Sequence, residues 1–193
     1  MPRILSAAVF CGSSPGNDPG YMAAATALGQ GLAAAGIRLV YGGGGIGLMG
    51  GVARAVHAAG GSVVGVIPEF LMRREMAHIE AGELIVTDSM HSRKNRMFEL
   101  ADAFVIMPGG LGTLDEMFEI LTWRQLGLHD KPILICNVLG AATAWVGVID
   151  AAIETGFARP EIRGLFEVVD GVPALLARLQ KLPATPAQTA TLL

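Results

Sequence analysis

Residues 90–137 read MHSRKNRMFELADAFVIMPGGLGTLDEMFEILTWRQLGLHDKPILICN, and this stretch decides how the chain folds. In its centre, the apolar run 103–107 leads into the glycine loop 108–113, which a helical apolar pattern follows. A strand, a glycine loop and a helix in this order bring backbone N–H groups to the positive end of the helix, where a phosphate binds well. Upstream, residues 92–96 place three cations at the start of another helical pattern, where the helix dipole disfavours them. An anionic ligand would explain both features.

The rest of the chain repeats the alternation of apolar runs and helical segments. The apolar runs are continuous rather than alternating, which is typical of buried parallel strands joined by crossover helices. We therefore predict an α/β fold, a Rossmann-like, doubly wound parallel sheet with helices on both faces. Strands are expected at 4–11, 37–41, 62–67, 84–86, 103–107, before Asn137 and at 166–169, and helices at 19–35, 47–59, twice within 90–137, at 141–155 and at 172–182.

Length and composition indicate one domain. The chain has 193 residues, of which 52% are hydrophobic and 16% charged, so it can bury a substantial core. Neither a linker nor an internal repeat is visible. We predict a single nucleotide-binding catalytic domain over residues 1–182 and a flexible C-terminal tail over residues 183–193.

Several classes of protein are disfavoured. A net charge of −3 gives no basic footprint for nucleic acid, and no segment is long and apolar enough to span a membrane. The first ten residues are better explained as a strand than as a signal sequence. Cys11 and Cys136 each end an apolar run and are expected to be buried thiols, and the four histidines lack metal-type spacing. We expect a cytoplasmic protein without a metal site.

Three motifs permit more than one interpretation. Gly45-Ile46-Gly47-Leu48-Met49-Gly50 matches the dinucleotide fingerprint, with Glu69 as the acidic residue, but it follows the second strand and tight helix packing explains its glycines better. Thr113-Leu114-Asp115-Glu116 fits a helix capping box, in which Glu116 reaches back to the Thr113 N–H, about as well as it fits a catalytic carboxylate. Arg93 and Lys94 have an ordinary alternative as a solvated basic turn.

In combination these motifs are specific. The run 108–116, with Met90-His91-Ser92-Arg93-Lys94 upstream, closely resembles the LOG ("Lonely guy") family of cytokinin riboside 5′-monophosphate phosphoribohydrolases, which are often mislabelled lysine decarboxylases. The resemblance covers nearly everything before the tail, including Val9-Phe10-Cys11-Gly12-Ser13-Ser14, Tyr41-Gly42-Gly43-Gly44, Gly47-Leu48-Met49-Gly50 and Leu128-His129-Asp130-Lys131-Pro132.

The resemblance implies that water cleaves an N6-modified adenosine 5′-monophosphate into free base and ribose 5-phosphate. It makes Glu116 and Arg93 the catalytic residues, with Arg93 acting electrostatically because a guanidinium is a poor general acid. It also implies a homodimer, or a larger assembly in some members, and neither a metal nor an organic cofactor. By the same resemblance, the substrate-binding residues are Glu75, Lys94, Gly109, Gly110, Gly112, Thr113 and Thr122.

Two other functions remain open at this point. One is a non-catalytic carrier of a nucleotide or of molybdenum cofactor, against which the carboxylate of Glu116 argues, since an anion carrier has no need of it. The other is a plain AMP nucleosidase, which the sequence does not separate from a cytokinin-type enzyme.

Overall fold

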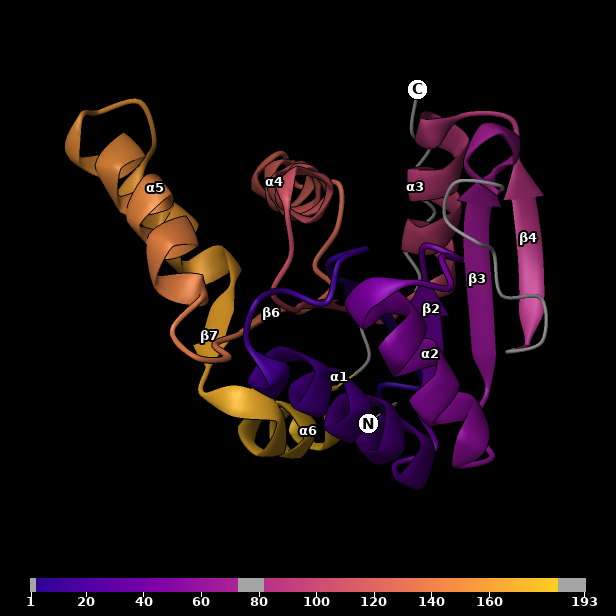
Figure 1. Cartoon of the computed structure of the whole chain (residues 1–193). Helices are drawn as coiled ribbons and strands as arrows, with labels where there is room; N and C mark the ends of the chain where they lie inside the picture. Colours follow the sequence, from indigo (N-terminus) through magenta and orange to yellow (C-terminus); the bar gives the residue numbers. More distant parts are fainter. Residues whose placement is uncertain (1–2, 73–81, 184–193) are drawn as a thin grey trace.

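The chain builds one parallel sheet. The computed structural model describes residues 3–72 and 82–183, and within them seven parallel strands lie in the order β4-β3-β2-β1-β5-β6-β7 (Figure 1). The five inner strands are short, mostly apolar runs that are buried along nearly their whole length, as predicted, whereas the two outer strands are partly exposed. The strands are β1 (Ser6–Phe10), β2 (Arg38–Tyr41), β3 (Val63–Pro68), β4 (Glu83–Thr87), β5 (Ala103–Ile106), β6 (Ile133–Cys136) and β7 (Glu167–Val169).

Helices cover both faces of this sheet, which confirms the predicted fold class. One face packs against α1 (Pro19–Ala34), α2 (Gly47–Ala58) and α6 (Gly171–Lys181), and the other against α3 (Met90–Leu100), α4 (Leu111–Gln125) and α5 (Ala142–Glu154) (Figure 1). Alternate strand residues serve the two layers: Ala7 and Val9 join the first core, while Ala8 and Phe10 join the second. The described residues also contain two short 3₁₀ segments, η1 (Glu69–Leu71) and η3 (Pro160–Leu165).

The order of the strands creates a switch point between β1 and β5. From β1 the chain builds outward through β2 and β3 to β4, and α3 then carries it back across the sheet to β5, on the other side of β1. From β5 it builds outward in the opposite direction through β6 to β7. Loops that leave two such strands diverge, and ligands of this kind of fold bind in the crevice between them.

Predicted and observed boundaries agree to within one or two residues for most elements. Arg3 and Pro183 form an isolated antiparallel bridge, so the described chain ends beside its beginning. Residues 184–193 of the predicted tail and residues 73–81, which include Glu75, lie outside the described residues. In the part that is described, every helix is too short or too polar to cross a membrane.

Several glycines serve close packing. A Cβ atom at Gly29 of α1 would lie 2.6 Å from the Ala55 Cβ and 2.6 Å from the Val52 carbonyl oxygen of α2. Gly47 has φ +60°, and a Cβ there would lie 2.3 Å from the carbonyl carbon of Ser13. Such contacts favour packing as the explanation for the glycines of the fingerprint-like segment 45–50.

The α1–α2 contact gives a first prediction. Gly29→Ala is expected to destabilise the protein by about 1–3 kcal/mol, because the added methyl group overpacks the interface. Gly147→Ala in α5 is the matched control, since a Cβ there meets nothing within 4 Å. The control should gain about 0.5–1 kcal/mol of helix propensity. Urea unfolding of both variants checks this, and equal effects would contradict the packing role of Gly29.

Candidate active site

Two glycine loops meet at the switch point. The Gly12 N–H, after β1, donates to the Pro108 carbonyl oxygen, after β5, at 3.0 Å. The Met49 N–H of α2 donates to the Gly12 carbonyl oxygen at 3.1 Å. These bonds hold the ends of β1, β5 and α2 together around the crevice.

The N-terminus of α4 opens into this crevice. Gly110 is the N-cap residue, and no side chain caps the helix. The helix itself offers no carbonyl partner to the N–H groups of its first three residues, Leu111, Gly112 and Thr113. A Cβ at Gly110 or Gly112 would meet nothing within 4 Å, so the backbone is open to a ligand on that side. An anion such as a phosphate fits these donors and the positive helix end.

The capping-box interpretation of Thr113 and Glu116 is wrong. The helix begins at Leu111, which makes Thr113 its third residue and Glu116 its sixth, whereas a capping box needs Thr113 at the N-cap. Gly110 occupies the N-cap position instead, without a side-chain bond. The buried position of Glu116, 8% exposed, therefore needs another explanation.

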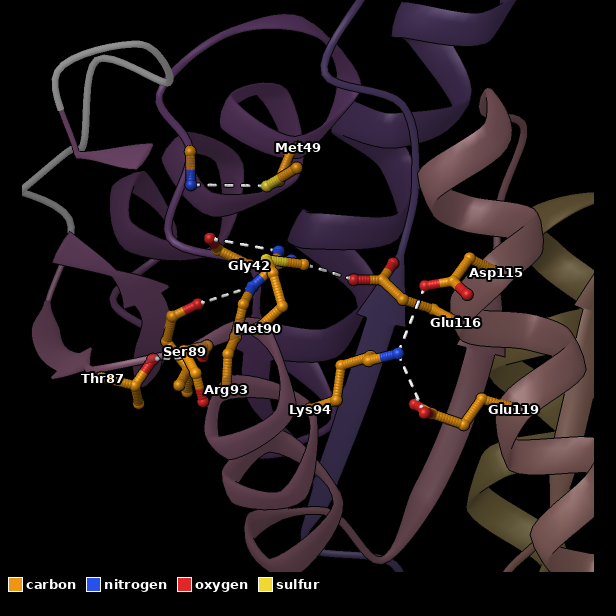
Figure 2. A network of polar contacts seen from close by, with 12 residues as sticks. Gly42, Met49, Thr87, Ser89, Met90, Arg93, Lys94, Asp115, Glu116 and Glu119 are labelled. Atoms are coloured by element: carbon orange, nitrogen blue, oxygen red, sulfur yellow. Dashed lines mark hydrogen bonds and ion pairs between the residues drawn. The ribbon is translucent and has the colours of Figure 1, made fainter. Parts of the chain in front are cut away.

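Arg93 supplies that explanation. Its side chain reaches from α3 across the sheet end, where Nε donates to the Val66 carbonyl oxygen at 3.1 Å and Nη2 to the Gly42 carbonyl oxygen at 3.4 Å. Its Nη1 lies 3.3 Å from Oε1 of Glu116 (Figure 2). Arg93 is 7% exposed, so this is a buried ion pair and not the solvated basic turn that was the alternative.

The electrostatics of Glu116 are dominated by burial. Burial raises the pKa of the Glu116 carboxyl to about 7, although the Arg93 cation opposes the shift. The neighbouring Cys11 thiol is also buried, and burial together with the Glu116 charge raises its pKa, so it stays neutral. A carboxyl that titrates near neutral pH can both accept and release a proton, as acid–base chemistry requires.

The ion pair and the helix end line one cavity of about 260 Å³. A second cavity of about 440 Å³ adjoins it and shares Gly12, Ser13 and Gly110. Sequence reasoning did not find the further lining residues Cys11, Met49, Leu71 and Met90. Cys11 had a usable signal, since it follows a strand at the switch point, whereas the other three depend on the packing of helices.

The remaining predicted residues are placed differently. Lys94 Nζ pairs with Asp115 at 3.3 Å and Glu119 at 2.9 Å, so its charge is held between α3 and α4 (Figure 2). Thr122 is exposed on α4, and its hydroxyl donates to the Phe118 carbonyl oxygen. Glu75 lies outside the described residues. Their substrate-binding roles remain predictions.

Helix α3 begins earlier than the cation cluster suggested. Ser89 is its N-cap and forms a capping box with Ser92, so Arg93 follows the first turn. Two of the three cations pair with acidic side chains of α4, Arg93 with Glu116 and Lys94 with Asp115 and Glu119. The third cation, Arg96, pairs with Glu99 of α3 itself at 2.8 Å. Within residues 3–72 and 82–183, His, Cys, Asp and Glu form no group of three suited to a metal ion.

Fold and site together define a Rossmann-like protein with an uncapped helix N-terminus and a buried Arg–Glu pair at its switch point. The sequence profile described as "Possible lysine decarboxylase" matches residues 49–179. The chain is 45% identical over 184 residues to the probable cytokinin riboside 5′-monophosphate phosphoribohydrolase LOGL5 of Oryza sativa subsp. japonica, covering 95% of this chain and 75% of that protein. It is 46% identical over 174 residues to LOG3 of Arabidopsis thaliana, a cytokinin riboside 5′-monophosphate phosphoribohydrolase, covering 90% and 80%. The chain belongs to this LOG family.

Solved structures support the fold alone. The molybdenum cofactor carrier protein of Chlamydomonas reinhardtii superimposes with a TM-score of 0.69 at 21% identity, covering 94% of this chain and 98% of that one. The molybdenum cofactor binding protein of Rippkaea orientalis gives 0.66 at 18% identity, covering 93% and 96%. At such identities the likeness shows the Rossmann-like α/β fold and does not favour the carrier alternative.

The raised pKa of Glu116 predicts a pH-dependent stability. Between pH 4.5, the ordinary carboxyl pKa, and about 7, the folded protein keeps a proton that the unfolded chain releases. Stability from this group is therefore fully present below pH 4.5 and is lost as the pH rises through 7. Glu116→Gln removes the dependence, so its stability relative to the parent protein should grow with pH by up to roughly 3 kcal/mol.

Urea unfolding of both proteins between about pH 4.5 and pH 8 measures this difference, because this range spans the titration of Glu116 in the unfolded and in the folded state. Glu154→Gln, at an exposed position of α5, is the control and should show a constant difference. A relative stability of Glu116→Gln that falls as the pH rises would overturn the assignment of a raised pKa.

Proposed function

We propose that this protein hydrolyses the N-glycosidic bond of an N6-modified adenosine 5′-monophosphate and releases the free base and ribose 5-phosphate. The observation that carries the proposal is the buried Arg93–Glu116 pair, which lines the same cavity as the N-terminus of α4. The names of the rice and Arabidopsis relatives supply the substrate class, a cytokinin riboside 5′-monophosphate.

In this proposal the glycine loop anchors the 5′-phosphate. The N–H groups of Gly112 and Thr113, together with the open backbone at Gly110, surround the phosphate at the positive end of α4. Gly109 allows the close approach of the loop to Thr113 and Gly12, since a Cβ there would lie 2.1 Å from Oγ1 of Thr113 and 2.8 Å from the Gly12 nitrogen. The phosphate is then the feature that holds the nucleotide, and a nucleoside lacking it would bind weakly.

Glu116 then acts on the sugar. Cleavage of the bond between the anomeric carbon and the purine nitrogen leaves the electron pair on the base and positive charge on the ribose. The ionised carboxylate stabilises that charge and takes a proton from the attacking water, whose oxygen bonds to the anomeric carbon. This proton then passes to the departing purine nitrogen, which gives the free base and restores the carboxylate. With a pKa of about 7, Glu116 is a stronger base than an ordinary carboxylate.

Arg93 stays charged throughout and acts electrostatically. Its guanidinium is fixed by the Val66 and Gly42 carbonyl oxygens, so it faces the reacting centre without reorganisation. There its positive charge stabilises the departing purine, which carries the electron pair of the broken bond. The half-buried Met49, Leu71 and Met90 provide an apolar wall for the base and an apolar N6 substituent.

Lysine decarboxylation, the activity in the description of the family profile, is poorly supported. Such chemistry usually needs a pyridoxal-phosphate lysine, and the chain has only three lysines. Lys94 pairs with Asp115 and Glu119, Lys131 donates to the Phe98 carbonyl oxygen, and Lys181 lies at the end of α6. None of the three lines the cavity of Arg93 and Glu116.

The proposal includes a cytoplasmic homodimer with substrate sites near the subunit boundary. Met117, Ile120 and Leu121 of α4 are buried in the core, whereas Leu111 and Leu126 are 86% and 66% exposed. A helix that covers one face of a sheet needs only one apolar stripe, so the exposed leucines favour a second contact surface.

The catalytic assignment predicts a large and selective loss. Glu116→Gln keeps the size of the side chain but removes its charge, so turnover should fall on the order of a hundredfold or more while nucleotide binding persists. Arg93→Ala should also be nearly inactive. Release of base from isopentenyl-AMP, AMP and isopentenyladenosine is the measurement, with Glu154→Gln as the control that stays active.

The three substrates separate the alternatives. The proposal expects cleavage of isopentenyl-AMP and little cleavage of the riboside, which lacks the phosphate. Equal cleavage of AMP would favour a plain AMP nucleosidase. If Glu116→Gln kept near-full turnover, the catalytic role of the carboxylate would be wrong, and nucleotide binding without any release of base would favour the carrier.

The dimer is tested through Leu126. Leu126→Glu should shift the protein toward monomers in the micromolar range, because a charge in an apolar interface is costly. Light scattering measures the mass. Val86→Glu, on the distant edge strand β4, is the control and should leave the assembly unchanged. A monomeric parent protein would refute the dimer.

A further inference from the structure

The two proposed catalytic side chains belong to different helices. Arg93 lies on α3 and Glu116 on α4, and their 3.3 Å separation is set by whatever holds these helices together. Lys94 provides one link beside the pair, through Asp115 and Glu119. A second link lies deeper, in the loop that follows α4.

His129 is the first part of that deeper link. It is 2% exposed, and its ring packs edge-on against Phe98 and Phe104, with centroids 5.2 and 5.6 Å away. Its Nδ1 accepts the Lys131 N–H at 3.1 Å, which assigns the proton to Nε2. Nε2 then donates to the Ile120 carbonyl oxygen of α4 at 2.9 Å.

Lys131 is the second part, and it reaches the other helix. Its ammonium donates to the Phe98 carbonyl oxygen of α3 at 2.6 Å and lies 4.0 Å from the centroid of the Phe98 ring. Phe98 stands in the last turn of α3, where the helix dipole favours a cation. One short loop therefore contacts the main chain of both helices.

The contacts of the loop with Phe98 and Ile120 lie at similar distances from the ion pair along α3 and α4. Phe98 comes five residues after Arg93, and Ile120 comes four residues after Glu116. At about 1.5 Å of rise per residue, both contacts are roughly 6–8 Å along the helix axes from the catalytic side chains. A change here would alter the distance between α3 and α4 at the level of the ion pair.

We propose that His129 and Lys131 are positioning residues for the hydrolysis, which fix the separation of α3 and α4 and so the contact between Arg93 and Glu116. This inference rests on the proposed function and assigns the loop after α4 a role in it. Neither residue lines the cavity, so both act through the helices that they join.

The direction of the expected effect follows from the charges around Glu116. Burial raises the pKa of this carboxyl most, and the charges of Asp115 and Glu119 on α4 raise it further. Arg93 and Lys94 of α3 lower it, and the Cys11 thiol beside it is neutral. If α3 moves away from α4, both cations recede while the acids stay. The pKa of Glu116 then rises, and the pH at which the carboxylate form appears moves upward.

Lys131→Met tests this directly, because it keeps the apolar stem over Phe98 and removes the ammonium. We expect kcat to fall about tenfold or more with KM changed less than about threefold, as for a misplaced catalytic group. The acidic limb of the pH–kcat profile should move to higher pH. Lys131→Arg, which restores a cation, should recover most of the rate.

A second variant tests the contact between His129 and α4. His129→Gln can still donate to the Ile120 carbonyl oxygen but lacks the aromatic ring and the fixed acceptor for the Lys131 N–H. The acidic limb of its pH–kcat profile should also move to higher pH. Arg178→Met is the matched control, since it removes a cation that pairs with Glu167 at 2.7 Å, between α6 and β7. It should lose stability without any change in kcat or in the pH limb.

A readout without catalysis separates failure of this inference from failure of the proposed function. The pH dependence of the stability difference between Glu116→Gln and its parent reports the pKa of Glu116, and it can be measured with and without Lys131→Met. An upward move of that transition supports the positioning role even if no nucleotide is hydrolysed. If neither Lys131→Met nor His129→Gln moves the pH limb or this transition, the loop is only structural and the inference is overturned.

Discussion

The buried guanidinium of Arg93 is the constraint on which the site depends. A cation taken out of water must be hydrogen-bonded and paired, or its burial costs several kcal/mol. Arg93 meets this requirement with the Val66 carbonyl oxygen of β3, the Gly42 carbonyl oxygen after β2 and the carboxylate of Glu116 on α4. Gly42 also makes room for it, since a Cβ there would lie 2.0 Å from Nη2 of Arg93. Strand ends and helices are thus fitted around one side chain.

The ion pair is better explained by chemistry than by stability. Replacing a buried pair with well-packed apolar residues is often neutral or stabilising, so its presence is weak support for a structural role. Here the Glu116 carboxyl also has a pKa raised to about 7, so at neutral pH its ionised form weakens the folded state. Perturbed acids in cavities are typical of functional sites. The neighbouring N-terminus of α4, which no side chain caps, offers N–H donors for the anionic substrate that we propose.

Much of the fold could be predicted from the sequence because local and global signals agree. Continuous apolar runs such as 103–107 predict buried parallel strands, and glycines such as Gly36 and Gly60 end the helices that separate them. The succession of β5, a glycine loop and α4 was also predictable from the order of apolar residues and glycines, whereas phosphate binding at this loop remains a prediction. The capping box failed because Thr-x-x-Glu is a local pattern, whereas the preceding glycines allowed α4 to begin three residues earlier than a cap at Thr113 requires.

The contact between Arg93 and Glu116 could not be derived from spacing. The two residues are separated by β5 and its glycine loop, and their distance depends on how α3 crosses the sheet. Only the family resemblance paired them. For the same reason Met49, Leu71 and Met90 were missed: each has a sequence position that suits an ordinary packing residue, and only the tertiary structure turns it toward the cavity.

The structure of α4 explains why the sequence predicts the glycine loop but not the contact between Arg93 and Glu116. The proposed phosphate donors in its first turn and the Glu116 carboxylate belong to one rigid element and lie about one helical turn apart, ~6 Å along the axis. The position of an anchored nucleotide relative to Glu116 is therefore encoded locally, in the segment from Gly109 to Glu116. Its position relative to Arg93 depends instead on the packing of α3 against α4. Substitutions that disturb this packing should alter the electrostatics of the reaction before they alter the binding of the phosphate.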